Sequence, residues 1–168
     1  GKKTNETLPS MIQMYIAALQ ADGSLRFSKG QKGYTGQGHR EHMPFPGASF
    51  KFTKQRKIDR LHWILKGCGV SYEENAGEFY ISGFEEIQEV AMRLLSSRKE
   101  FLHGTEELYD STFIEELRHW DGWKKQYYTT SKANAEFVQT VGHMQGYMVS
   151  VALKINHTPS YVVCISSE

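Results

Sequence analysis

The residues that suggest chemistry most directly are two Asp-Gly pairs, Asp22-Gly23 and Asp121-Gly122, each placed where a segment of helical periodicity stops. They lie about a hundred residues apart, as in an internal duplication. Two carboxylates brought close together repel each other unless a divalent cation lies between them. Mg²⁺ is a hard cation that accepts carboxylate oxygens and can stabilise charge on a phosphate. A single Asp-Gly pair is also a common end of a helix, and that reading explains either pair taken alone.

Each pair must be positioned by the elements around it, and the first half of the chain supplies a long series. Pro9 suits a first helical turn, and the apolar residues from Met11 to Leu19 follow helical spacing up to Gly23. Phe50 and Phe52 alternate with polar residues, which indicates a strand with one polar face. In order, the patterns predict a helix over 8–21, a strand over 24–33, a loop over 36–47, a strand over 49–53, a helix over 56–66, a hairpin of 70–72 with 78–81, and a long helix over 84–101.

The same order then begins again in a shorter form. The patterns predict a helix over 111–119, a strand over 126–130, a helix over 133–144 and paired strands over 147–155 and 161–165. We therefore predict one domain over 1–168 with an internal repeat, a first half over 8–104 and a shorter second half over 111–168.

The charges are segregated, although the net charge is only +1. Residues 24–57 hold eight Lys or Arg against one acid, Glu41, whereas residues 70–125 hold thirteen acids against six Lys or Arg. A concentrated positive segment suits a polyanionic partner, and a solvated charged face is the equally simple alternative.

Other classes of protein find little support. No apolar stretch is long enough to cross a bilayer, and the first residues lack the pattern of a signal peptide. Cys68 and Cys164 have no metal-ligand spacing and are too few for a disulfide framework, so an intracellular, reducing setting is expected. His39 and His42, with Cys68, could suggest a metal site, but a loop position explains both histidines better.

Four segments carry a resemblance to a known family. Segment 15–23 (YIAALQADG) closely resembles the motif that names the LAGLIDADG homing endonucleases, and segment 114–122 (IEELRHWDG) occupies the matching place in the second half. Segment 50–57 (FKFTKQRK) resembles the strand-to-helix junction of that family. Segment 127–133 (YYTTSKA) is its counterpart and is similar to intein-encoded members. The resemblance extends from about Leu8 to Ser166.

This resemblance implies a fold and an activity. The fold is α+β, with two pseudo-symmetric αββαββ(α) halves that form a saddle of antiparallel sheets. The activity is site-specific hydrolysis of double-stranded DNA, with Mg²⁺ (or Mn²⁺) held by Asp22 and Asp121. Ala17, Ala18 and Ala21 suit the close contact of two helices that would bring these acids together. A monomer is expected, with an intein or an intron as a possible host context and without splicing residues of its own.

The resemblance also implies roles for basic and polar residues. Lys54 would lie in the active site at the first junction, with Ser131 or Lys132 as its second-half counterpart. Lys99, next to Arg98, matches a lysine near the active site. Alternate residues of the strands would read DNA in the major groove or hold its phosphates. The candidates for DNA binding are Arg26, Lys29, Lys32, Tyr34, Arg40, Lys51, Arg56, Tyr128, Ser131, Lys132 and Lys154, with Gln37 and Gln126 beside them.

The second motif departs from the family pattern at two positions. Glu116 and Trp120 stand where small residues are usual, so the helix pair is expected to be loosened or shifted by a turn. The site should then be asymmetric, with the first half holding DNA more tightly. The alternatives are a module of the same fold that binds DNA or RNA without cutting, such as a maturase or a regulator, and an inactive remnant.

Overall fold

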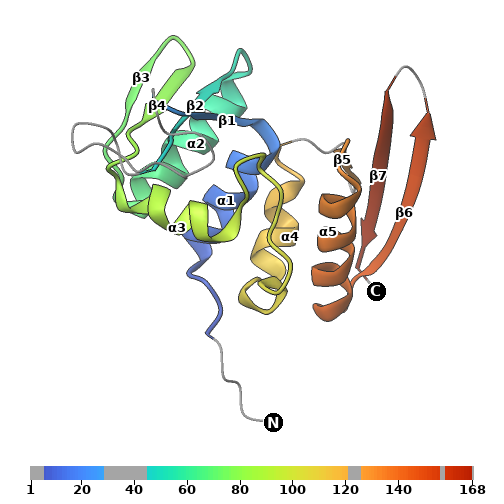
Figure 1. Ribbon diagram of the computed structural model, residues 1–168. Coiled ribbons are helices and arrows are strands. Elements are labelled where there is room, and N and C mark those ends of the chain that lie inside the picture. Colours follow the sequence, from blue (N-terminus) through green and yellow to red (C-terminus); the bar gives the residue numbers. More distant parts are fainter. Residues whose placement is uncertain (1–5, 29–44, 121–125, 156–157, 168) are drawn as a thin grey trace.

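Two antiparallel sheets stand on either side of a group of helices in the computed structural model of the chain (Figure 1), which describes residues 6–28, 45–120, 126–155 and 158–167. The first sheet has the order β1 (Gly23–Arg26), β2 (Gly47–Lys51), β4 (Glu78–Ile81) and β3 (Glu73–Asn75). The second has the order β5 (Gln126–Thr129), β7 (Pro159–Ser166) and β6 (Met148–Ile155). The predicted α+β class with antiparallel sheets is confirmed.

The helices lie between the sheets. They are α1 (Ser10–Asp22), α2 (Gln55–Cys68), α3 (Glu86–Leu94), α4 (Ser111–Leu117) and α5 (Lys132–Met144), with a short 3-10 turn, η2 (Glu106–Leu108), before α4. In Figure 1, α1 and α4 lie side by side in the centre, and α5 runs along the second sheet. Within the described ranges, no helix has the length and apolar character needed to cross a membrane.

Helix α1 is covered on every side, because all five residues from Tyr15 to Leu19 are fully buried. Its buried amide, Gln13, fixes it to α4. The Gln13 Oε1 accepts hydrogen bonds from the backbone N–H groups of Asp110 and Phe113, at 3.0 and 3.2 Å. These N–H groups lie at the start of α4, where backbone partners are few, and that of Phe113 also donates to the Asp110 carbonyl oxygen at 3.1 Å. Helices α1 and α4 are thus locked together at their N-terminal ends.

Helix α4 is fixed to α2 by the two residues expected to loosen it. Glu116, with only 1% of its side chain exposed, receives two bonds from the Arg60 guanidinium, at 2.5 and 3.0 Å. The Trp120 indole N–H donates to the same carboxylate at 2.9 Å, and the indole stacks on the Phe52 ring. The carboxylate is therefore satisfied by Arg60 and Trp120, and the loosening or shift expected of the α1–α4 pair stays a prediction.

The long helix predicted over 84–101 is also wrong. Helix α3 ends at Leu94, and Leu95 then forms an isolated antiparallel bridge with Phe101. The loop between them closes through the Ser96 carbonyl, which accepts from Lys99 N, and Lys99 itself has a φ of 62°. Phe101 has the phase expected for a continuing helix, but it packs on Phe113 and Phe137 instead. In the same hairpin region, the first strand lies at 73–75 and not at 70–72.

The turn between β3 and β4 presses against the end of β2. Gly77 has a φ of 86°, and a Cβ added there would lie 2.2 Å from the Phe52 carbonyl oxygen. The Gly77 carbonyl accepts from Phe52 N at 2.9 Å, so the turn cannot move away without losing this bond. Phe52 leads into α2, and the turn therefore holds the strand-to-helix junction in place.

Replacing Gly77 with alanine is expected to lower the free energy of unfolding by at least about 2 kcal/mol, because backbone strain and a clash add together. Gly69→Ala is the matched control: its φ is 71°, but no atom lies within 4 Å of the added Cβ. It should cost about 1 kcal/mol, from strain alone. Urea denaturation measures both values, and equal losses would contradict the clash.

Candidate metal centre and nucleic-acid interface

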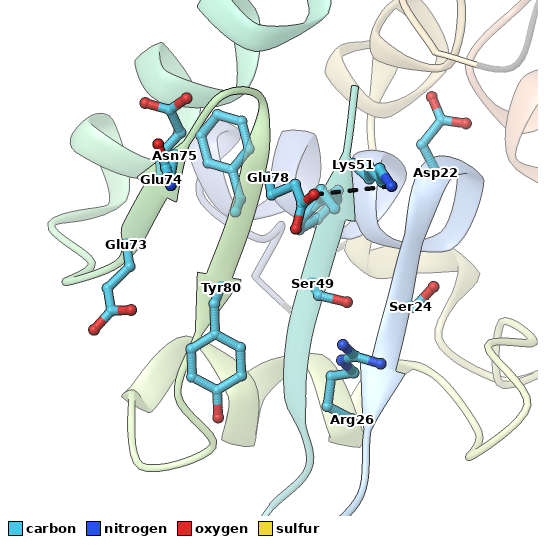
Figure 2. A pocket seen from close by; sticks show the side chains of 12 residues that line it. Asp22, Ser24, Arg26, Ser49, Lys51, Glu73, Glu74, Asn75, Glu78 and Tyr80 are labelled. Atoms are coloured by element: carbon cyan, nitrogen blue, oxygen red, sulfur yellow. Dashed lines mark ion pairs between the residues drawn. The ribbon is translucent and has the colours of Figure 1, made fainter. Parts of the chain in front are cut away.

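The first sheet has one face toward the helices and one open face. Strand pairing aligns Phe50 with Phe79 and Ala48 with Ile81 on the buried face. The alternate residues form the open face, with the helices behind the sheet (Figure 2). These open-face residues are Ser24, Arg26, Ser49, Lys51, Glu73, Asn75, Glu78 and Tyr80, and they line a concavity of about 690 Å³ together with Asp22.

The open face carries both signs of charge. Arg26 and Lys51, both predicted to bind DNA, are exposed on it. Glu73 and Glu78 come from the neighbouring hairpin, and Glu78 lies 3.8 Å from Lys51 with both side chains solvated (Figure 2). The hairpin thus places carboxylates beside strands of the segment that is rich in Lys and Arg. Of the other residues predicted to bind DNA in the first half, Arg56 lies in the first turn of α2, whereas Lys29, Lys32, Tyr34 and Arg40, with Gln37, lie outside the described residues.

Asp22 ends α1 beside this face, and its carboxylate is held by a lysine. The Lys57 Nζ lies 2.8 Å from the Asp22 Oδ2, and the two side chains are only 15% and 18% exposed. Lys57 belongs to the first turn of α2, and its ammonium also lies 5.8 Å from the centre of the Phe52 ring. A cavity of about 190 Å³ is lined by Asp22, Lys51, Phe52, Thr53, Lys54 and Lys57. It holds three lysines and one carboxylate, an arrangement suited to a phosphate.

Lys54 and Arg56 were both predicted to serve the site, but their side chains lie in different surroundings. Lys54 is the exposed N-cap residue of α2 and lines the cavity of Asp22. Arg56 points toward α4, where its Nη1 donates to the His119 carbonyl oxygen at 2.9 Å. It therefore caps the turn that follows α4. Burial, together with the charge of Arg60, lowers the pKa of His119.

A second cavity lies on the other side of the end of α1, next to the second sheet. It has a volume of about 540 Å³ and brings together Lys99, Tyr128 and Ser131, all predicted site residues, with Arg98 and Gln20. The Lys99 Nζ donates to the carbonyl oxygens of Leu19 and Gln20 in the last turn of α1 and to that of Gly23, the first residue of β1. A cation is favourable at that helix end. The Ser131 hydroxyl donates to Glu100 at 3.1 Å and accepts from Asn134 N.

The second sheet also has an open face, formed by the even-numbered residues of its strands. Tyr128 lies on it and donates its hydroxyl hydrogen to Gln126. Lys154 is exposed on the edge strand, and Lys132 lies at the start of α5, 3.9 Å from Glu136. Lys154 is the one cation on the strands of this sheet within the described residues.

The candidate metal ligands differ in how well their atoms suit a metal ion. Asp22 offers a hard oxygen ligand in a solvent-reachable cavity, which fits Mg²⁺ or Mn²⁺, ions commonly held by one or two carboxylates with waters and phosphates. Asp121 lies outside the described residues, and among those described no group of three His, Cys, Asp or Glu gathers. Cys68 does not fit: its thiol donates to the Met11 carbonyl, and burial raises its pKa to about 11.

Sequence reasoning missed two members of this region, Lys57 and Arg60. In the sequence, both are recognisable only as basic residues of the helix predicted over 56–66. Their spacing of three places them on one side of α2. The pattern alone did not show that this side meets Asp22 at one position and Glu116 at the other.

The fold is similar to solved structures of homing endonucleases. The chain is similar to the homing endonuclease I-DmoI in complex with DNA and Mn, with a TM-score of 0.56 and 17% identity over 94% of this chain and 90% of that one. A second I-DmoI complex, with a nicked target DNA and Mn, gives a TM-score of 0.59 and 14% identity over 94% and 88%. The homing endonuclease I-WcaI, bound to its DNA recognition sequence, gives 0.58 and 12% over 95% and 78%.

No protein-family model and no curated protein matched the chain. At identities this low, the structural similarity shows the fold alone. The expected homing endonuclease fold is confirmed.

Proposed function

We propose that this protein is a metal-dependent endonuclease that binds double-stranded DNA across the open faces of its two sheets and cuts it at a specific site. One observation carries the proposal. The chain has the fold of I-DmoI over 94% of its length, and an acidic residue with lysines around it ends the central helix beside the open face. I-DmoI and I-WcaI are described as homing endonucleases bound to their DNA.

Each group of the site has a proposed role. Asp22 and Asp121 would hold Mg²⁺ or Mn²⁺, which supplies charge stabilisation at a phosphate and acidifies water. Lys54 would face the phosphate from the first cavity, and Lys99 would stabilise the end of α1 and lie near the phosphate in the second. Ser131, or Lys132, is the counterpart of Lys54.

The DNA interface follows from the same faces. Arg26, Lys51 and Lys154 are exposed and Tyr128 is half-buried where a duplex would lie, and we keep all four as proposed DNA contacts. The predicted role of Arg56 changes to a positioning one, because its guanidinium is used by the His119 carbonyl. Lys29, Lys32, Tyr34 and Arg40 remain proposals on sequence grounds.

The interface is tested by equilibrium binding of a short duplex at several salt concentrations. The double variant Arg26→Gln/Lys51→Gln should bind at least about tenfold more weakly than the wild type and should lower the slope of log affinity against log salt by up to about two. Arg93→Gln/Lys66→Gln removes the same charge from exposed positions of α3 and α2 and serves as the control. Equal slopes for all three proteins would contradict the interface.

Cutting is tested by incubating a randomised pool of duplexes with Mg²⁺ and recovering cleaved molecules. Binding without cleavage at any site would support the alternative of a module that does not cut. The Lys57–Asp22 ion pair is the observation that keeps this alternative in view, because it already neutralises one proposed metal ligand.

We further propose that the chain is one domain of two related halves, 8–104 and 111–168, acting as a monomer. The order α1-β1-β2-α2-β3-β4-α3 in the first half parallels α4-β5-α5-β6-β7 in the second. Excision from an intein is the proposed origin, based on the intein-like segment 127–133. Sedimentation of the protein with and without duplex tests the monomer.

A further inference from the structure

The ion pair between Lys57 and Asp22 lies where a bound divalent cation and a DNA phosphate would come close together. Its 2.8 Å distance joins the Lys57 Nζ to one oxygen of the carboxylate proposed to hold the metal. Both side chains are largely withdrawn from solvent, so water screens the pair less than an exposed one. A divalent cation must therefore compete with an ammonium group for the same carboxylate.

Phosphate would compete for the other member of the pair. The cavity around Lys57 is lined by three lysines against a single carboxylate, so it has an excess of positive charge. A DNA phosphate that entered this cavity would attract the Lys57 ammonium, and the lysine side chain has the rotatable stem needed to turn toward it. Asp22 would then lose its internal partner and become available to a cation.

We infer that Lys57 is a positioning residue that couples the two binding events. While Lys57 is paired with Asp22, it opposes the binding of a divalent cation. When DNA draws its ammonium to a phosphate, the opposition ends. Because such coupling is reciprocal, a bound cation also frees Lys57 for DNA. The protein would thus take up its metal mainly when DNA is present. This inference rests on the proposed function, and it assigns Lys57 a part in regulating the same site.

The first test measures Mn²⁺ binding by the protein without DNA, from the EPR signal of free Mn²⁺. Asp22→Asn defines which part of the binding belongs to this site. Lys57→Met keeps an unbranched stem against Phe52 but removes the charge, and it should bind Mn²⁺ on the order of tenfold more tightly, a factor typical of the coupling between two sites. Lys57→Arg restores the charge and should return the affinity to the wild-type value.

Lys66→Met is the matched control, because it makes the same substitution at an exposed position of the last turn of α2. It should leave the Mn²⁺ affinity unchanged. Thermal melts of every variant verify that the proteins are folded. Equal or weaker Mn²⁺ binding by Lys57→Met, or binding that Asp22→Asn does not reduce, would overturn the inference.

The second test measures the affinity for a short duplex with and without Mn²⁺. Screening of the DNA by Mn²⁺ is common to all variants and cancels in their ratio. Mn²⁺ should improve duplex binding by the wild type more than by Lys57→Met, by a factor similar to the difference in Mn²⁺ affinity. Equal improvement would overturn the coupling and leave the proposed function standing. Failure of the wild type to bind any duplex would instead overturn the proposed function, while the first test would still decide whether Lys57 opposes the cation.

Discussion

Replacement of Glu116 by alanine is expected to lower the free energy of unfolding by about 3 kcal/mol, the largest loss we expect from any single substitution outside the apolar core. The carboxylate is 1% exposed and receives two bonds from Arg60 and one from Trp120. Its removal leaves a guanidinium and an indole N–H without their partner. Breaking such a pair costs about 3–5 kcal/mol, and the partial exposure of Arg60, 27%, places the loss near the lower limit.

The measurement is urea denaturation of the wild type and three variants. Glu89→Ala is the control, because Glu89 pairs with Arg93 on the surface of α3, and it should cost no more than about 0.5 kcal/mol. Arg60→Met/Glu116→Met replaces the whole pair by apolar side chains and should recover most of the loss. If Glu116→Ala were as mild as Glu89→Ala, the network could not be what holds α4 against α2.

Replacement of Asp22 by asparagine is expected to reduce Mg²⁺-dependent cleavage of duplex DNA by at least about 100-fold, the effect typical of removing one charge-stabilising group. Duplex binding should not weaken, since the proposed base contacts lie on the strands and the loss of the Asp22 charge leaves Lys57 available to a phosphate. The loss of the ion pair with Lys57 should cost about 1 kcal/mol of stability, because the asparagine side-chain oxygen can still accept a hydrogen bond from the ammonium.

Single-turnover cleavage and equilibrium binding separate these effects. Asp59→Asn is the control, since it removes a carboxylate from an exposed position of α2, where Asp59 only accepts a bond from Gln55. It should cleave at the wild-type rate. An Asp22→Asn protein that cut DNA as fast as the wild type would exclude Asp22 as a metal ligand.

Much of the fold could be predicted from the chain, because local and tertiary preferences agree there. Helix α1 follows the periodicity of residues 8–21 to within two positions, and the alternation around Phe50 identified the buried face of β2. Agreement failed at Leu95, where the helical phase continues to Phe101 but a tertiary bridge ends the helix. A periodic pattern records the phase of apolar residues and not the partner that each one packs against.

The residues of the candidate site could be named from the sequence, but the charges around them could not. Lys54, Lys99 and Ser131 line cavities at the end of α1, and their part in catalysis stays a prediction. The positive segment, however, meets the acidic hairpin across the strands, and Arg56 turns to the His119 carbonyl. Runs of charge along a chain do not specify which strands become neighbours, so the mixed face required the register of the sheet.

The central claim is that Asp22 serves a metal that cuts duplex DNA, and one measurement addresses it directly. A randomised pool of duplexes is incubated with Mg²⁺ and either the wild type or Asp22→Asn, and cleaved ends are recovered and sequenced. The account predicts a single enriched cut site for the wild type, its loss when Mg²⁺ is withheld, and no enrichment with Asp22→Asn. No enriched site with a wild-type protein that binds the pool, or the same site recovered with Asp22→Asn, would contradict it.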